Sequence, residues 1–311
     1  MDKNFLTVLM RMRNENLFLE SFIKHYFAEG VDEIHILDDN STQPFPDIVN
    51  DPRVFIYEAT HFKSHHEKLI DAQLLYKHLL KDKTEWFMFV DADEFITTRR
   101  NSEKTIREEL ETTFKDADLI KIPWIMFGSN GQDENPKQVL TETTWRWDHD
   151  KKHPHPEEAL KIWKHRCCKY DKIEVKSIFK TKAFAKLTTH CPSDPTYNIN
   201  IVDGVDNIPN YAGVDETEIW YYNLREECID RAYLACNHYR NISKEQMRQK
   251  ADDSHLPLYR VSNCYELQLA SDFSDIEDTF LKEKAIKRKY YERRIQNNWT
   301  RRKQKNYKNR C

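Results

Sequence analysis

The feature that most constrains this chain is an apolar run that ends abruptly in three carboxylates. Residues 86–90 are five successive apolar side chains, which is what a β-strand buried on both faces requires. Asp91 and Asp93 follow where the strand gives way to a turn, so both carboxylates can approach one ion. Mg²⁺ and Mn²⁺ take oxygen ligands and fill their remaining positions with water and phosphate. The pattern predicts a site for a metal-bound diphosphate, and the simpler alternative is a solvated acidic turn.

The first third of the chain alternates between strand and helix patterns. Apolar runs are separated by stretches in which apolar residues recur at helical spacing, and Gly30 is a good stop for the first helix. Strand, helix and strand in this order are typical of parallel βαβ units. The acidic residues then lie at strand carboxyl ends, where open α/β sheets bind ligands. We expect strands at 5–10, 31–37, 54–57 and 86–90, and helices at 17–27 and 67–80.

The pattern is looser in the rest of the chain. Ser243 opens a helix that its hydroxyl can cap, and Gln246, three residues on, completes a capping box. Elsewhere, we expect helices at 102–116, near 157–168, ending at 236–239 and along 275–305, strands at 119–124, 139–147, 173–180 and 219–222, and irregular chain at 190–211.

The composition is that of a globular protein. The 311 residues are enough for one large α/β domain, or for one domain with an appendage. No stretch approaches the 18 or so apolar residues of a membrane helix, and the first residues do not form a signal peptide. Seven cysteines without Cys-x-x-Cys spacing predict free thiols in a reducing compartment rather than a zinc site. We therefore expect a cytoplasmic protein.

Several enzyme classes lack their motifs in this sequence. There is no Gly-x-Gly-x-x-Gly and no Walker loop, which disfavours dinucleotide oxidoreductases and P-loop kinases. There is also no Gly-x-Ser-x-Gly elbow, so a hydrolytic triad has no support.

Charge is distributed unevenly along the chain. From Lys282 to the C-terminus there are thirteen Lys or Arg and two Glu, a net charge of +11, so the preceding residues carry −14. Aromatic residues are interleaved with basic ones between Tyr290 and Arg310, which fits nucleic-acid binding. The same pattern fits docking to an anionic membrane surface. We expect an acidic body with a basic interaction tail, and we favour peripheral membrane contact over nucleic acid.

Polar side chains also follow the first and second predicted strands. Arg11 and Arg13 follow the first strand, where guanidinium groups can clamp phosphate oxygens. The alternative is a surface salt bridge with Glu15 or Glu20, and for Arg13 it is an equal one. Asp38 and Asp39 end the second strand, where carboxylates can accept hydrogen bonds from a base or ribose. The alternative for this pair is an Asx-turn. Because a second acidic strand end occurs at Asp91, we favour nucleotide contact.

Histidines offer further ligands. His238, between Asn237 and Tyr239, can bind a metal when neutral or contact a phosphate when charged, although a packed side chain is the commoner case. His190 is a competing candidate. We interpret the group formed by His149, His153 and His155 as a surface loop that lines an acceptor site.

Taken together and in order, these motifs resemble the family 2-like glycosyltransferases, closest to the branch grouped with family 92. The similarity covers roughly residues 5–250, and Gln43 departs from it by replacing the Asp that commonly ends the Ser-Thr-Asp run. Four blocks carry the resemblance: the opening with Arg13-Asn14-Glu15, Gly30-Val31-Asp32 and Asp38-Asp39-Asn40-Ser41-Thr42, then Trp86 to Phe95, then Trp124 to Gly131 with its Phe-Gly-Ser loop, and finally Asn237-His238-Tyr239 with Ser243 and Lys250.

The resemblance implies an α/β fold of the GT-A type. Such a fold has a mixed central sheet flanked by helices, and here we expect a C-terminal helical extension after it. Residues 1–98 would form the nucleotide-sugar half, 99–250 the acceptor half and 251–311 the basic helical extension. The resemblance also implies a Mn²⁺ or Mg²⁺ ion between the protein and the diphosphate of a UDP- or GDP-sugar. The expected nucleotide-sugar contacts are Met10, Arg11, Arg13, Asp38, Asp39, Asp91 and Ala92, and the expected metal ligands are Asp91, Asp93 and His238.

The reaction expected from this resemblance is sugar transfer to a hydroxyl of a glycan, lipid-linked or protein-linked acceptor. If transfer inverts the anomeric centre, a carboxylate must deprotonate that hydroxyl from the opposite face. We place this base at Asp133, on the loop after Gly131, with Glu134 and Asp148 as rivals. The alternatives are a metal-dependent nucleotidyltransferase, against which the missing Gly-rich first loop argues, and a nucleic-acid-binding protein that uses the basic tail.

Overall fold

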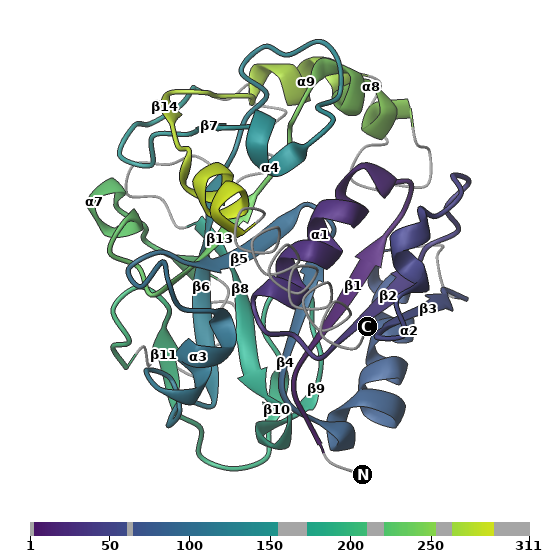
Figure 1. Ribbon diagram of the computed structural model, residues 1–311, viewed down its shortest axis with the longest axis vertical. Coiled ribbons are helices and arrows are strands. Elements are labelled where there is room, and N and C mark those ends of the chain that lie inside the picture. Colours follow the sequence, from purple (N-terminus) through teal and green to yellow (C-terminus); the bar gives the residue numbers. More distant parts are fainter. Residues whose placement is uncertain (1–2, 61–64, 155–172, 210–220, 253–262, 289–311) are drawn as a thin grey trace, which may run out of the picture.

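The protein is built around one mixed β-sheet (Figure 1). The computed structural model describes residues 3–60, 65–154, 173–209, 221–252 and 263–288. Within these residues the sheet has ten strands, of which β11 (Ile201–Asp203) pairs with β6 and β12 (Tyr221–Tyr222) with β8. The other strands run in the order β3 (Val54–Glu58), β2 (Glu33–Asp38), β1 (Asn4–Met12), β4 (Thr84–Asp91), β8 (Ile173–Lys180), β6 (Leu119–Met126), β13 (Leu234–His238) and β5 (Glu94–Thr98).

The first four strands form the predicted parallel part of the sheet. β1 pairs in parallel with both β2 and β4, and β2 pairs in parallel with β3. Helix α1 (Asn16–Ala28) connects β1 to β2, and α2 (His65–Leu75), continued by a π-helical turn at Tyr76–Leu80, connects β3 to β4. Gly30 follows α1 with a φ of +91°, a backbone conformation that glycine adopts without strain. The predicted alternation of strands and helices is confirmed here.

Strand β8 makes the sheet mixed, because it runs antiparallel to both of its neighbours, β4 and β6. It has the bounds predicted for it. Strand β13 is parallel to β6 and antiparallel to β5, so the prediction of a helix ending at 236–239 is wrong. Leu234 and Ala235 favour a helix locally, but the gap between β6 and β5 requires a buried strand, and tertiary context overrides the local preference.

Other local predictions differ from the structure in the less regular part of the chain. The strand predicted at 139–147 begins as a helical turn, α4 (Val139–Glu142), and only β7 (Trp145–Arg146) is extended. Helix α3 (Ile106–Glu111) is shorter than predicted, and it starts at a Thr105 capping box. The segment expected to be irregular contains β10 (Ser193–Pro195), which pairs with β9 (Phe184–Lys186). The helix predicted near 157–168 lies outside the described residues.

Helices α7 (Glu226–Ile229), α8 (Lys244–Asp252) and α9 (Cys264–Ala270) belong to the second half of the chain. The Ser243 hydroxyl accepts a hydrogen bond from the Gln246 N–H at 3.0 Å, so it caps α8 as predicted. The other half of the predicted capping box is shifted by one residue, because the Gln246 side chain accepts from the Ile242 N–H at 3.4 Å.

Both faces of the sheet are covered, because the side chains of its central strands alternate between two apolar clusters. Val8, Met88 and Val90 belong to the cluster on the face of α1 and α3, whereas Leu9 and Phe89 belong to the cluster on the face of α2. Burial on two faces explains why β4 reads as a continuous apolar run. The predicted fold class, an α/β arrangement of a mixed central sheet flanked by helices with C-terminal helical segments, is confirmed.

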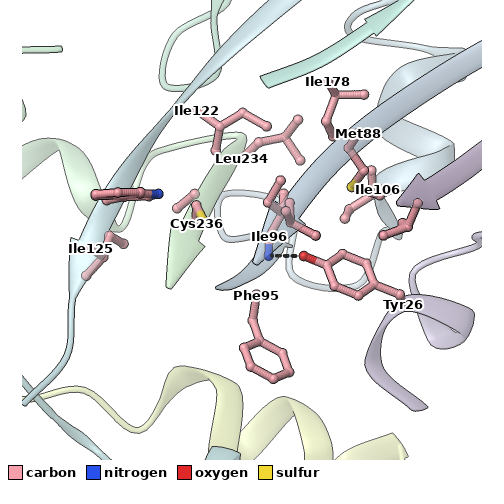
Figure 2. Packing of buried hydrophobic residues seen from close by; sticks show 14 of the residues in the cluster. Tyr26, Met88, Phe95, Ile96, Ile106, Ile122, Ile125, Ile178, Leu234 and Cys236 are labelled. Atoms are coloured by element: carbon pink, nitrogen blue, oxygen red, sulfur yellow. Dashed lines mark hydrogen bonds between the residues drawn. The ribbon is translucent and has the colours of Figure 1, made fainter. Parts of the chain in front are cut away.

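Helix α1 fixes the position of β5 through one buried side chain. The Tyr26 hydroxyl donates to the Glu94 carbonyl oxygen at 2.9 Å. It also accepts from the Ile96 N–H at 3.1 Å, the bond that Figure 2 shows. Phe95 packs against both Phe22 and Tyr239, which come from α1 and from the residue after β13. These contacts with the hydrophobic core therefore hold the turn between β4 and β5 in place.

Residues 263–288 pack against the rest of the protein through buried ion pairs. The Lys284 amine lies 2.9 Å from the Glu29 carboxylate, and Arg288 contacts the same carboxylate at 2.7 Å. Asp278 contacts both Arg99 and Arg146. The long basic helix predicted along 275–305 begins later than expected, because β14 (Ile276–Glu277) pairs with β7 and the helical residues start at 280. Residues 289–311 lie outside the described residues, and the predicted domain division stays a prediction.

Two further observations concern the described residues only. Their cysteines, Cys191, Cys228, Cys236 and Cys264, are buried free thiols, as predicted. None of their helices combines the length and the apolar character needed to cross a membrane.

Candidate active site

Three strands end together at one edge of the sheet and bring the predicted residues to it. In the parallel register Arg11 on β1 lies beside Asp91 on β4, and Met12 lies beside Asp38 on β2. The Asp39 N–H donates to the Met12 carbonyl oxygen at 2.9 Å. Because β2, β1 and β4 are consecutive strands, the acidic ends of β2 and β4 lie about 10 Å apart. This arrangement lets one ligand reach both.

Asp91 is partly exposed at the end of β4. Its side chain is 33% exposed, and its Oδ2 accepts a hydrogen bond from the Lys176 amine at 3.0 Å. Burial raises the pKa of Asp91, but Lys176 and Arg11 together lower it by more, so the pKa lies below its ordinary value. Asp91 is therefore ionised at neutral pH.

Asp93 lies deeper, in the turn between β4 and β5. Its Oδ2 accepts from the Lys250 amine at 3.1 Å, and its Oδ1 faces the His238 Nε2 at 3.5 Å. Burial raises the pKa of Asp93, but Lys250 and His238 outweigh that effect and hold the pKa well below its usual range. The carboxylate faces two nitrogen groups from two distant elements, α8 and β13.

Glu94, the third carboxylate of the run, is completely buried. Its Oε2 accepts from the Asp91 N–H at 2.7 Å and lies 3.1 Å from the Lys176 amine. Burial, together with Asp91 and Asp93, raises the pKa of Glu94 well above its ordinary value despite the nearby lysine. Glu94 thus supports the turn from inside, and it is not exposed to a ligand.

Glu15, at the start of α1, faces the same group of charges. Its carboxylate lies 3.9 Å from the Lys250 amine. Burial and the nearby Asp93 raise the pKa of Glu15 to about 8, although Lys250 opposes them. The candidate site therefore contains four carboxylates, of which Asp91 and Asp93 are held ionised by lysines.

The two arginines differ in what they contact. The Arg13 guanidinium donates to the carbonyl oxygens of Asp39 and Asn40 at 2.6 and 3.0 Å, so it shapes the loop after β2. The salt bridge considered for it is not among the ion pairs of the described residues. Arg11 has a buried Nη1 with no hydrogen-bond partner in the described part of the chain. A buried guanidinium nitrogen in this state is suited to an anionic ligand.

The remaining predicted nucleotide contacts have mixed surroundings. The Asp38 Oδ1 accepts from the Ser41 N–H at 3.0 Å, three residues on, so this side chain binds its own loop with a span one residue longer than the Asx-turn that was the alternative. Asp39 is 3% exposed. The side chains of Met10 and Ala92 are completely buried, so only their main-chain atoms can face a ligand. The roles of all four residues stay predictions.

His238 lies at the carboxyl end of β13, in register with Glu94 on β5 and with Met126 on β6. Its ring packs against Trp124 with a centroid distance of 4.3 Å, and its Nδ1 is buried without a hydrogen-bond partner among the described residues. His190, the competing candidate, contacts the Val175 carbonyl oxygen through Nδ1 at 2.9 Å. Burial lowers the pKa of His190 to about 4. Of the two, His238 is the one that faces Asp93.

Asp133 lies on a loop that contacts the start of α8. Its side chain is 77% exposed and contacts the Lys244 amine at 2.8 Å, while its carbonyl oxygen accepts from the Glu245 N–H at 3.0 Å. Lys244 lowers the pKa of Asp133. Of the rivals, Glu134 is exposed, and the Asp148 Oδ1 accepts from the Asp150 N–H in a local turn.

The histidines near the predicted acceptor loop are packed rather than exposed. His153 is 3% exposed, contacts Asp275 at 2.7 Å through Nε2 and stacks on Phe273. His149 is 1% exposed and lies against Glu226. The interpretation of a surface loop is therefore wrong for these two, because aromatic and acidic neighbours enclose them, and His155 lies outside the described residues.

A divalent cation fits the donor groups at the edge of the sheet. Among the residues that the structure describes, no three His, Cys, Asp or Glu side chains form a ready cluster for a metal. Mg²⁺ and Mn²⁺ do not need one, because one or two carboxylates with substrate phosphate and water suffice. Two ligands of one octahedral ion lie about 3 Å apart, close to the 3.5 Å between Asp93 and His238. Asp93 and His238 would hold the ion, and the role of Asp91 as a further ligand stays a prediction.

The sequence reasoning missed the lysines that hold the acidic turn. Lys176 lies on β8 and bridges Asp91 and Glu94, and nothing in the sequence of this strand distinguishes it, because Glu174, Ser177 and Lys180 are also polar. Lys250 was noted only as part of a motif block. Glu15 likewise had no role assigned to it, because nothing local places it beside Asp93.

The sequence of residues 14–259 matches glycosyltransferase family 92. The protein belongs to this family. The assignment makes residues 14–259 a glycosyltransferase domain, and it decides against the nucleotidyltransferase and nucleic-acid-binding alternatives as descriptions of that domain. No curated protein matches the chain.

Solved structures resemble this family 92 protein only weakly. A mannosyltransferase from Pyrobaculum calidifontis in complex with GDP-mannose and Mn²⁺ is 17% identical over 39% of this chain and 35% of its own, with a TM-score of 0.28. Mannosyl-3-phosphoglycerate synthase from Rubrobacter xylanophilus is 13% identical over 44% of this chain and 45% of its own, with a TM-score of 0.28.

Glucosyl-3-phosphoglycerate synthase from Mycobacterium tuberculosis, in complex with Mn²⁺, UDP and glucosyl-3-phosphoglycerate, is 12% identical over 59% of this chain and 61% of its own, with a TM-score of 0.30. This chain thus spans less than two thirds of each of the three structures. At these TM-scores the likeness supports no conclusion about the present protein, and the assignment rests on the family match.

Proposed function

We propose that this family 92 protein transfers a sugar from a UDP- or GDP-sugar to an acceptor hydroxyl with the help of Mn²⁺ or Mg²⁺. The observation that carries the proposal is the meeting of Arg11, Asp91 and Asp93 at one edge of the sheet. Paired carboxylates suit a metal-bound diphosphate, and a buried guanidinium nitrogen without a partner in the described residues suits a phosphate oxygen. When bound, the metal supplies positive charge that stabilises the leaving diphosphate.

We infer that transfer inverts the anomeric centre, with Asp133 as the general base. The bond between the anomeric carbon and the diphosphate oxygen breaks, the acceptor oxygen forms the new bond, and its proton passes to the base. Lys244 keeps Asp133 ionised, as a base must be. Asp133 contacts Lys244 and Asp93 contacts Lys250. These lysines are six residues apart on α8, about 9 Å along its axis.

The acceptor we propose is a hydroxyl of a glycan or of a lipid-linked or protein-linked glycan, with the basic tail aiding contact at an anionic membrane surface. A truncation that tests the tail should begin at residue 289. Lys284 and Arg288 are tied to the buried Glu29, so removing them would damage the fold rather than test the tail.

A thermal-shift experiment tests the donor and the metal. UDP or GDP with Mn²⁺ is expected to raise the melting temperature of the wild-type protein, and Asp93→Asn is expected to abolish the rise. Asp133→Asn serves as the matched control, because it should keep the rise while losing sugar transfer in an assay of nucleotide release. No rise with any nucleotide in the wild-type protein would contradict the proposal.

A further inference from the structure

The Lys250 amine contacts the Asp93 carboxylate, which the metal would also use. The Lys250 side chain is 13% exposed, and its amine lies 3.1 Å from the Asp93 Oδ2. It also donates to the Arg240 carbonyl oxygen at 3.2 Å and lies 3.9 Å from the Glu15 carboxylate. An ammonium group therefore already neutralises the carboxylate for which a divalent cation would compete.

Lys176, the second lysine of the site, has a different role. Its side chain is 1% exposed, and it bridges Asp91, the fully buried Glu94 and the Thr189 carbonyl oxygen. No ion from solvent can replace it at Glu94, because that carboxylate is completely buried. Lys176 is a fixed part of the fold, so any exchange of cations has to take place at Lys250.

A divalent cation and the Lys250 ammonium cannot share Asp93 comfortably. Charges of the same sign a few ångströms apart in a poorly solvated site repel each other strongly. Lys250 has other acceptors within reach, since the Glu15 carboxylate and the Arg240 carbonyl oxygen lie beside it. The side chain can release Asp93 and keep hydrogen-bonding partners without any movement of α8.

We propose that Lys250 is a displaceable counter-ion, which holds Asp93 in the metal-free protein and yields this carboxylate to the divalent cation. The inference rests on the proposed metal-dependent function. Lys250 balances the charge of the metal-free site. It also lowers the affinity for the metal alone below the affinity that the carboxylates would have without Lys250. Lys250 is thus a positioning residue for the metal rather than a catalytic one.

The test measures binding of Mn²⁺ alone by electron paramagnetic resonance of the free ion. Lys250→Met is expected to bind Mn²⁺ on the order of tenfold more tightly than the wild type, because a charged hydrogen bond to the ligand no longer has to be broken. Lys250→Gln repeats the measurement in case the methionine variant does not fold. Lys244→Met, which removes a lysine from the exposed start of the same helix, and Lys250→Arg, which keeps the charge, should both leave the affinity unchanged.

The outcomes separate this inference from the function on which it rests. If the wild type binds Mn²⁺ and the Lys250→Met and Lys250→Gln variants bind it equally or less tightly, Lys250 is a structural clamp and the inference is overturned while the function stands. If neither the wild type nor any variant binds Mn²⁺, even with UDP or GDP present, the metal-dependent function fails and the inference fails with it.

Discussion

Replacing Lys176 by methionine should destabilise the protein far more than an ordinary strand substitution. Lys176 is 1% exposed as a side chain and lies 3.0 Å from Asp91 and 3.1 Å from the fully buried Glu94. Methionine keeps most of the apolar stem but leaves the ionised Asp91 without its counter-ion. Removing one partner of a buried ion pair costs about 3 to 5 kcal/mol, because the other charge remains buried and uncompensated.

The assay is urea unfolding at pH 7 followed by circular dichroism. Burial lowers the pKa of Lys176, but Asp91 and Glu94 outweigh this effect and raise the pKa, so Lys176 is charged and its ion pair with Asp91 is fully present at pH 7. With an m-value of about 2 to 3 kcal/mol per molar urea, the midpoint should fall by roughly 1 to 2.5 M.

Two further variants identify the cause. Lys180→Met on the same strand removes an amine that donates to the Lys115 carbonyl oxygen and lies over the Trp86 ring, and it should cost only about 1 kcal/mol. Adding Asp91→Asn to Lys176→Met should recover part of the loss, because it removes the uncompensated charge. The reasoning is refuted if Lys176→Met costs no more than Lys180→Met, or if the double variant recovers nothing.

Two other substitutions test the loop and the pH response. Gly128→Ala would place its Cβ 2.2 Å from the Phe273 carbonyl oxygen. In Gly131→Ala the new Cβ meets no atom within 4 Å, so its only cost is the backbone strain of a φ of +73°, about 1 kcal/mol. The melting temperature should therefore fall clearly more for Gly128→Ala, and equal falls would contradict this packing. Burial lowers the pKa of His25 to about 4, so between pH 6.5 and 4 the unfolded chain takes up a proton that the folded protein does not, and stability should drop by about 3 kcal/mol as the pH falls. When the free energy of unfolding is measured across this pH range, His25→Gln should make its dependence on pH less steep. His78→Gln, which changes a surface residue, should leave the dependence as in the wild type. An unchanged dependence for His25→Gln would count against the argument.

Local pattern was enough to determine the parallel half of the sheet and the placement of the acidic turn. β4 is buried on both faces, so its apolar run and its end at Asp91 are visible in the sequence. Gly30 ends α1 through a property of the single residue, and the β1 to β4 alternation follows from periodicity. Arg11 could be placed beside Asp91 because the carboxyl ends of parallel strands meet at one edge of a sheet.

Only the tertiary structure decided what the acidic turn contacts. Lys176 and Lys250 reach Asp91 and Asp93 across 85 and 157 residues of sequence, and no local pattern encodes such a meeting. His238 faces Asp93 because residues 234–238 form a strand between β6 and β5, although Leu234 and Ala235 favour a helix by themselves. Periodicity reports which face of an element is buried, whereas the partner across that face depends on the order of strands in the sheet. The sequence alone therefore identifies the carboxylates of the site, whereas the tertiary structure decides which positive charges balance them.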